Sequence, residues 1–199
     1  MVQAHHDLPK RIDGAYRYSD PWFAAYIRRI FIDSLGLPEG QLQGLLDELF
    51  RSFEDPSTFE LYPGTHELIA SARAEGLCVG VISNWSARLP RVLEGVGLHE
   101  SFDFVLCSAI EELEKPEVEI FQRALQKAGV APREALHAGD HPEKDVAAAQ
   151  RAGMEGVLVD HQRIFENQTV LGQRVVSLSE LSVYVGEKIS GDQGRSEGL

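Results

Sequence analysis

Short apolar, β-branched runs alternate with segments of helical spacing through the second half of the chain, and this alternation restricts the fold more than any other feature. Four runs, which end at Ser83, Cys107, Ala138 and Val159, have the length and composition of buried strands. Between them apolar residues recur every three or four positions, as in residues 118–128. Strands and helices in this order predict an α/β fold, in which helices cover both faces of a parallel sheet.

The first third of the chain has helical spacing only. Apolar residues mark one helix from Trp22 to Phe31 and a second from Leu42 to Phe53. Asp33 follows an apolar run and superficially resembles a residue at a strand end, but the run continues the first helical stripe, so we predict a helix there. We therefore expect a disordered N-terminal segment at 1–13, a helical region at 14–60, an α/β core at 61–185 and a disordered tail at 186–199.

Polar side chains follow several of the predicted strands. Ser83 and Asn84 end the first run, Lys115 lies in the loop before the helix at 118–128, and Asp140 and Asp145 follow the third run. Ligands of parallel sheets bind beyond the carboxyl ends of the strands. A hydroxyl, an ammonium group and paired carboxylates suit an anionic group held beside Mg²⁺. Each of these residues alone is typical of a turn, a helix cap or a solvated surface, and only their order is informative.

The composition of the chain restricts the classes of partner that it can bind. The formal net charge of −12 argues against nucleic acid and against an anionic membrane surface. There is no apolar run of about 18 residues that would span a membrane. Cys78 and Cys107 both lie in apolar runs, which favours two buried, reduced thiols and a cytoplasmic location.

Three strings carry a resemblance to a known family. VISNW, EKPEVEIF and HAGDHPEKDVAAAQRAGM resemble, in this order, the second, third and fourth motifs of the haloacid dehalogenase superfamily. YPGTHELIASARAEG resembles the segment that leads into the second motif. The resemblance covers residues 14–185, and it is closest to the subfamily called haloacid dehalogenase-like hydrolase domain-containing protein 3.

The resemblance implies a Rossmann-like parallel sheet with helices on both faces and a small helical cap at residues 14–60. It also implies roles for the polar residues: Ser83 would hydrogen-bond a transferring phosphoryl group, and Lys115 would stabilise its charge. Asp140 would help to hold Mg²⁺ with support from Asp145, and Asn84 would line the pocket. The sequence departs from the family pattern at His141, Glu112 and Glu117–Val118.

The first motif of the family is an apolar strand that ends in Asp-x-Asp, and its first aspartate is the nucleophile. No residue before position 14 belongs to such a strand. We therefore expect the central first strand to be missing and the chain to be inactive by itself. The hypothesis is an N-terminally shortened enzyme, from a misplaced start, a genuine short form or a decayed gene.

Several functions stay open at this point. The first is a Mg²⁺-dependent hydrolase of small phosphorylated metabolites, complete only with a further segment. Dehalogenation in the same fold is one alternative. A non-catalytic binding or regulatory protein that keeps an anion pocket is a second, and a nonfunctional fragment is a third. An exposed sheet edge could also pair with a second copy to form a homodimer.

Overall fold

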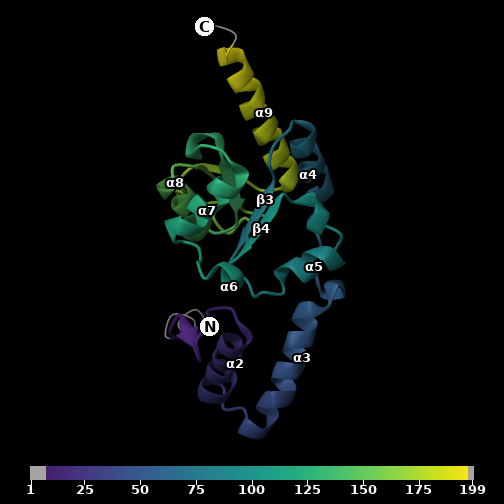
Figure 1. Ribbon diagram of the computed structural model, residues 1–199, viewed down its shortest axis with the longest axis vertical. Helices are drawn as coiled ribbons and strands as arrows, with labels where there is room; N and C mark the ends of the chain where they lie inside the picture. Colours follow the sequence, from purple (N-terminus) through teal and green to yellow (C-terminus); the bar gives the residue numbers. More distant parts are fainter. Residues whose placement is uncertain (1–7, 197–199) are drawn as a thin grey trace. The chain divides into compact units, whose positions relative to one another are not determined.

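Short strands and helices alternate along residues 8–196, which the computed structural model describes; side chains are described for residues 8–191. In chain order the strands and α-helices are β1 (Arg11–Ile12), β2 (Ala15–Tyr16), α2 (Asp20–Arg28), α3 (Leu42–Glu54), α4 (Thr65–Ala74), β3 (Gly80–Ser83), α5 (Leu89–Gly95), β4 (Phe104–Cys107), α6 (Ser108–Glu111), α7 (Val118–Ala128), β5 (Leu136–Gly139), α8 (Ala148–Arg151), β6 (Glu155–Val159), β7 (Gln173–Val175) and α9 (Leu178–Ser196) (Figure 1). π-Helical turns extend α2 over Arg29–Ser34 and precede α8 over Pro142–Ala147. The α/β class predicted from the sequence is confirmed.

Two compact units make up the chain. One unit runs to Glu60 and adds Val81–Glu100 and Val105–Glu114. The other comprises Leu61–Gly80, Ser101–Phe104 and the chain from Lys115 onward.

In the first unit, packing around Trp22 joins α2 to the residues that precede it. The Trp22 side chain is fully buried, its ring stacks on Tyr26 at 5.4 Å between centroids, and its indole N–H donates to the Pro9 carbonyl at 2.9 Å. The amphipathic α3 buries Leu46 and contacts α5. The apolar run before Asp33 is helical, as predicted.

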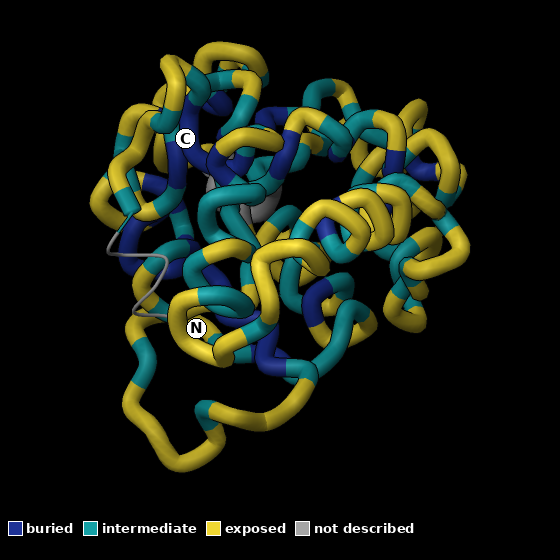
Figure 2. The backbone as a smooth tube through the Cα atoms, turned by 90° about the horizontal axis from the view of Figure 1, so that it is seen from below, coloured by how far each residue is buried: buried dark blue, intermediate teal, exposed yellow. Residues whose placement is uncertain are grey.

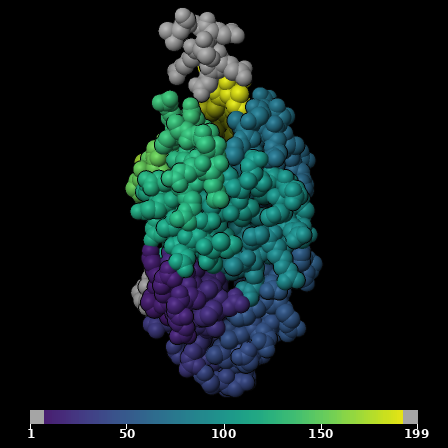
Figure 3. Space-filling model, in the orientation of Figure 1, coloured from purple at the N-terminus to yellow at the C-terminus, as the bar shows by residue number. Residues whose placement is uncertain are grey.

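In the second unit, a parallel sheet with the order β5–β6–β7 has helices on both faces. Val157 and Val159 pack with Leu181 and partly buried residues of α4 and α9. Gly156 faces the opposite way, where the backbone of Val146 approaches too closely for any side chain at position 156. The helices α4 and α9 lie side by side in Figure 1, and the yellow surface of α9 adjoins the blue surface of α4 in Figure 3.

The strands form separate sheets. β3 pairs with β4, and β5 pairs with β6. Within residues 8–196, β3 and β5 each have only this one hydrogen-bonded strand neighbour.

Some predicted boundaries are wrong. The strand predicted from Leu77 begins at Gly80, and Cys78 is exposed, although Cys107 is buried as expected and both thiols are free. α9 continues to Ser196, past residue 185, where the disordered tail was predicted to start. β1 falls in the segment 1–13 that was also predicted to be disordered, whereas residues 1–7 lie outside the described part.

Exposed residues repeat along the helices between buried and half-buried ones, which is the mark of amphipathic surface helices (Figure 2). Over the described residues, no helix combines the length and the apolar character needed to cross a membrane.

Candidate functional site

The loop that carries Ser83 and Asn84 is fixed by the end of the neighbouring strand. The Trp85 N–H donates to the Ser108 hydroxyl at 2.9 Å, and the Ala109 N–H donates to the Trp85 carbonyl at 3.2 Å. The Cys107 thiol donates to the carbonyl of Ser86 at 2.8 Å. Because Cys107 and Ser108 are almost completely buried, the backbone that follows Ser83 has little freedom to move.

A buried network holds Asn84 from the other side. The Tyr18 hydroxyl donates to the Glu114 carboxylate and shares a hydrogen bond with the Asn84 amide. Arg17 donates to Glu114 at 2.7 Å, and Glu114 is 5% exposed. Burial, with a smaller contribution from the Glu114 charge, raises the pKa of Tyr18 well above its usual value, so this hydroxyl stays protonated.

Aromatic rings surround a pocket of about 230 Å³ in the same unit. Its lining consists of Tyr18, Phe23, Phe50, Phe53, Asn84, Trp85, Ser86 and Arg88. The Phe53 ring meets Trp85 edge-on at 6.4 Å between centroids, and it lies tilted against Phe23 at 6.2 Å. The pocket thus joins the loop after β3 to the helices α2 and α3.

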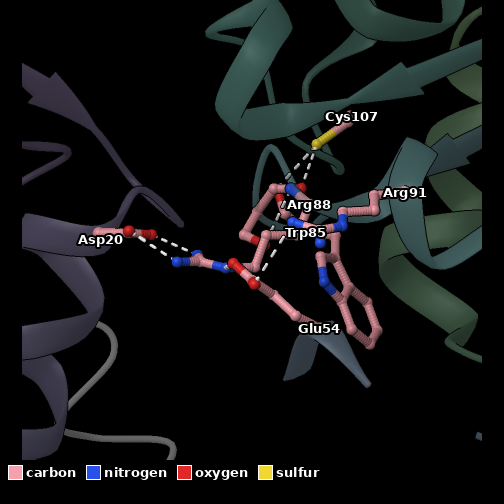
Figure 4. Close-up of polar contacts among 7 residues, drawn as sticks. Asp20, Glu54, Trp85, Arg88, Arg91 and Cys107 are labelled. Carbon is pink, nitrogen blue, oxygen red and sulfur yellow. Dashed lines mark hydrogen bonds and ion pairs between the residues drawn. The ribbon is translucent and has the colours of Figure 1, made fainter. Parts of the chain in front are cut away.

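The positive charge of Arg88 is already compensated. Its two terminal nitrogens donate to the two oxygens of Asp20, and its Nε donates to Glu54 at 2.8 Å (Figure 4). The guanidinium also lies over the Phe50 ring at 4.9 Å from the centroid. Because Asp20 and Glu54 already accept hydrogen bonds from Arg88, its guanidinium lines the pocket as a flat group over the Phe50 ring, and its charge is largely neutralised before any ligand binds.

In the second unit, the Asp145 carboxylate accepts hydrogen bonds from three donors. Lys115 Nζ lies 2.5 Å from Oδ1, His137 Nε2 lies 3.0 Å from the same oxygen, and the His141 N–H donates to Oδ2 at 2.9 Å. The side chains of Asp145, His137 and Lys115 are 3%, 10% and 13% exposed. Asp145 comes from the π-helical turn after β5 and Lys115 from the loop before α7.

Burial by itself would raise the pKa of Asp145. The hydrogen bond from His137 and the positive charge of Lys115 outweigh it, so the pKa lies well below the ordinary value and Asp145 is ionised. Burial lowers the pKa of His137, which is therefore neutral at pH 7 and donates its Nε2 proton to Asp145. The cluster is a buried ion pair oriented by a neutral imidazole.

Gly139 makes the approach of Asp145 to β5 feasible. A Cβ at position 139 would lie 2.6 Å from both Cβ and Oδ2 of Asp145. His141 ends this turn and caps the helix, because its Nδ1 accepts the N–H of Glu143 at 3.2 Å. Its ring thus has a structural contact at the position where the sequence departs from the family. Asp140, between them, is exposed at the end of the strand.

The carboxylates fit Mg²⁺ unequally. Among the side chains that the structure describes, at residues 8–191, there is no group of three or more His, Cys, Asp or Glu arranged as a metal site. Both oxygens of Asp145 accept hydrogen bonds, whereas Asp140 presents its carboxylate at the surface. Because Mg²⁺ commonly binds through one or two carboxylates plus substrate phosphate and water, Asp140 suits such an ion.

The structure places the predicted residues in two groups. Ser83 and Asn84 belong to the first unit, and Lys115, Asp140 and Asp145 belong to the second, where Lys115 and Asp145 are in contact. Sequence reasoning missed the residues that orient them, Tyr18, Glu114 and His137. Glu114 and His137 each begin one of the quoted motif strings, which was a usable signal, whereas Tyr18 lies far from the motifs in the sequence and had none.

Comparison with known proteins identifies the family of the chain. The family described as haloacid dehalogenase-like hydrolase matches residues 10–153. The chain is 35% identical over 142 residues to the bovine haloacid dehalogenase-like hydrolase domain-containing protein 3, and the aligned region covers 71% of this chain and 56% of that protein. It is 36% identical over 156 residues to a phosphoserine phosphatase of Thermus thermophilus, covering 72% of this chain and 61% of that protein.

A crystal structure of a HAD phosphatase from Thermococcus onnurineus has the same fold. The two superpose with a TM-score of 0.66 at 21% identity, over 82% of this chain and 88% of the other. The chain thus spans little more than half of its bovine relative and most of the superposed phosphatase. The matched region includes the candidate residues of the second, third and fourth motifs, and the chain belongs to the haloacid dehalogenase-like hydrolase family.

Proposed function

We propose that this chain carries the phosphate- and magnesium-binding residues of a phosphatase-type hydrolase that acts on small phosphorylated metabolites. The observation that supports it best is the buried pair of Lys115 and Asp145 beside the exposed Asp140. A lysine held this firmly, on the rim of a parallel sheet, suits the stabilisation of charge on a transferring phosphoryl group. Two relatives of the chain carry phosphatase names, the phosphoserine phosphatase already described and a glyceraldehyde 3-phosphate phosphatase of Methanothermobacter.

Each residue has a distinct role in this proposal. In the first unit, the Ser83 hydroxyl and the Asn84 amide are donors suited to phosphoryl oxygens. In the second unit, Lys115 is a cation suited to the charge of a phosphoryl group. Asp140 supplies the carboxylate for Mg²⁺, which when bound polarises a phosphoryl oxygen. Asp145 holds Lys115 in place, with His137 fixing the orientation of the carboxylate.

We further propose that the 199 residues alone do not turn over substrate. Besides Asp145, the buried carboxylate that follows a strand of the second unit is Asp160. Asp160 accepts hydrogen bonds from Arg174 at 2.9 Å and from the Ile164 and Phe165 N–H groups, so its oxygens are already engaged. A carboxylate with this set of donors is a poor nucleophile.

Calorimetric titration of the purified chain with inorganic phosphate and Mg²⁺ tests the binding half of the proposal. We expect binding in the wild-type chain and its loss in Lys115→Ala. Lys127→Ala, which removes an exposed lysine of α7, serves as the matched control and should bind normally. Equal binding by both variants would refute the role of Lys115.

A colorimetric aryl phosphate assay tests the catalytic half. The chain should show no turnover, whereas a chain fused to an apolar segment that ends in Asp-x-Asp should gain Mg²⁺-dependent turnover. Turnover by the unmodified chain that disappears in Lys115→Ala would show that a nucleophile is already present. Phosphate binding without any turnover in the fused chain would instead favour a non-catalytic binding protein.

A further inference from the structure

The aromatic pocket near the loop after β3 has the size and lining of a ring-binding site. Aromatic residues supply five of its lining side chains, Tyr18, Phe23, Phe50, Phe53 and Trp85. Its volume of about 230 Å³ exceeds the roughly 150 Å³ of an apolar protein cavity that holds benzene, so it accommodates one ring or two fused rings. Rings that meet edge-on, such as Phe53 and Trp85, offer the geometry that a further flat group prefers.

The charges around the pocket argue against a second ionic group on its ligand. Arg88 is the cationic side chain of the lining, and its terminal nitrogens donate to Asp20 while its Nε donates to Glu54. A carboxylate or a second phosphate would therefore have to displace an existing ion pair. An ammonium group would find no carboxylate among the lining residues.

Asn84 connects the pocket to the proposed phosphate site. Its backbone follows Ser83 directly, and its side chain lines the pocket while it is hydrogen-bonded to Tyr18. The Tyr18 hydroxyl is itself held by Glu114, so the polar edge of the pocket is preorganised. A phosphate bound at Ser83 and Asn84 would thus have its ester substituent beside the rings.

From these observations we propose that the pocket binds an uncharged aromatic group, and that the substrate is an aryl or arylalkyl monophosphate. This inference rests on the proposed function for the position of the phosphate. It predicts a preference opposite to that of a phosphoserine phosphatase, because the carboxylate of phosphoserine would compete with Asp20 and Glu54 for Arg88, and its amino group would find no carboxylate in this lining.

Calorimetry on the full 199-residue chain, with four probes, tests the inference. The probes are 1-naphthyl phosphate, phosphoserine, inorganic phosphate and 1-naphthol. We expect 1-naphthyl phosphate to bind at least about tenfold more tightly than inorganic phosphate, since a buried ring removes much apolar area from water. Phosphoserine should bind no more tightly than inorganic phosphate.

Two phenylalanines provide a matched pair of variants. Phe53 and Phe59 both contact the Trp85 ring, at 6.4 and 5.8 Å between centroids, but only Phe53 is among the pocket-lining residues. Phe53→Ala should weaken 1-naphthyl phosphate about tenfold and leave inorganic phosphate unchanged, whereas Phe59→Ala should change neither. If Phe53→Ala does not fold, Phe53→Leu keeps apolar volume without the ring and should still weaken the naphthyl probe.

The outcomes separate the two proposals. Loss of inorganic phosphate binding alone would refute the proposed function, and 1-naphthol binding would then still report on the pocket. Phosphoserine binding as tight as 1-naphthyl phosphate, or equal effects of Phe53→Ala and Phe59→Ala, would overturn the inference. Absence of binding by both naphthyl compounds would overturn it as well.

Discussion

Replacement of Gly139 by alanine should disrupt the buried pair of Lys115 and Asp145. The new Cβ would lie 2.3 Å from Asp145 Cγ, about 1.1 Å short of the 3.4 Å at which ordinary contact begins. Moving the carboxylate by that amount lengthens its bonds to His137 and to the His141 N–H, now 3.0 and 2.9 Å, beyond hydrogen-bonding range. The substitution therefore acts through Asp145, although it changes an apolar position on β5.

The magnitude follows from the burial of the pair. Asp145 and Lys115 are 3% and 13% exposed, so neither charge gains full hydration once the pair separates. Separating a buried ion pair costs about 3–5 kcal/mol. At about 2–4 °C per kcal/mol for a chain of this size, the midpoint of thermal unfolding should fall by about 6–20 °C.

Urea unfolding followed by circular dichroism measures the change, with Gly44→Ala as control. Gly44 lies within α3, and a Cβ added there would meet no atom within 4 Å, so alanine should stabilise the chain by about 0.5–1 kcal/mol. A cost below about 1 kcal/mol for Gly139→Ala would refute the packing of Asp145 against β5.

Three further substitutions test other parts of the structure. Asp145→Asn should flatten the acid dependence of stability. Because folding lowers the pKa of Asp145, this group contributes to the free energy of unfolding at pH values above its unfolded pKa of about 3.9, and the contribution is lost as the pH falls below that value. An unchanged slope of stability against pH between about pH 5 and pH 2 in the variant would contradict this. Trp22→Ala should cost about 3–5 kcal/mol in urea unfolding, because the ring is fully buried, and a cost below about 1 kcal/mol would contradict its place in the core. Glu114→Gln should destabilise the chain by about 3–5 kcal/mol, because it leaves Arg17 buried without a counter-charge, and should also weaken phosphate binding through Asn84; normal stability and binding would show that the network has no such role.

The parts of the fold that were predictable have strong local signals. α7 runs from Val118 to Ala128 as predicted, since its apolar stripe is regular and Gly129 adopts the left-handed conformation that ends a helix. The strand predicted from Leu77 begins later, because the Val79 N–H donates to the Asp103 side chain at 2.7 Å. Such a contact between distant residues has no signature in the run itself.

Some features of the candidate site could also be predicted from the sequence, and others could not. The motif strings pointed to Ser83, Lys115 and Asp140 because their order along the chain is distinctive. The pairing of Lys115 with Asp145 spans 30 residues and depends on how a turn packs against β5. His137 occupies an ordinary strand position, and only the three-dimensional structure brings it to a carboxylate.

The hydrogen bonds between the loop after β3 and the end of β4 have an evolutionary consequence. Because the Cys107 thiol and the Ser108 hydroxyl both bind backbone groups of residues 85–86, the shape of that loop is specified by two separate stretches of sequence. Amino-acid substitutions in the loop alone would therefore not be enough to change the substrate among relatives. Positions 107–108 should therefore covary with positions 84–86 across relatives that differ in specificity.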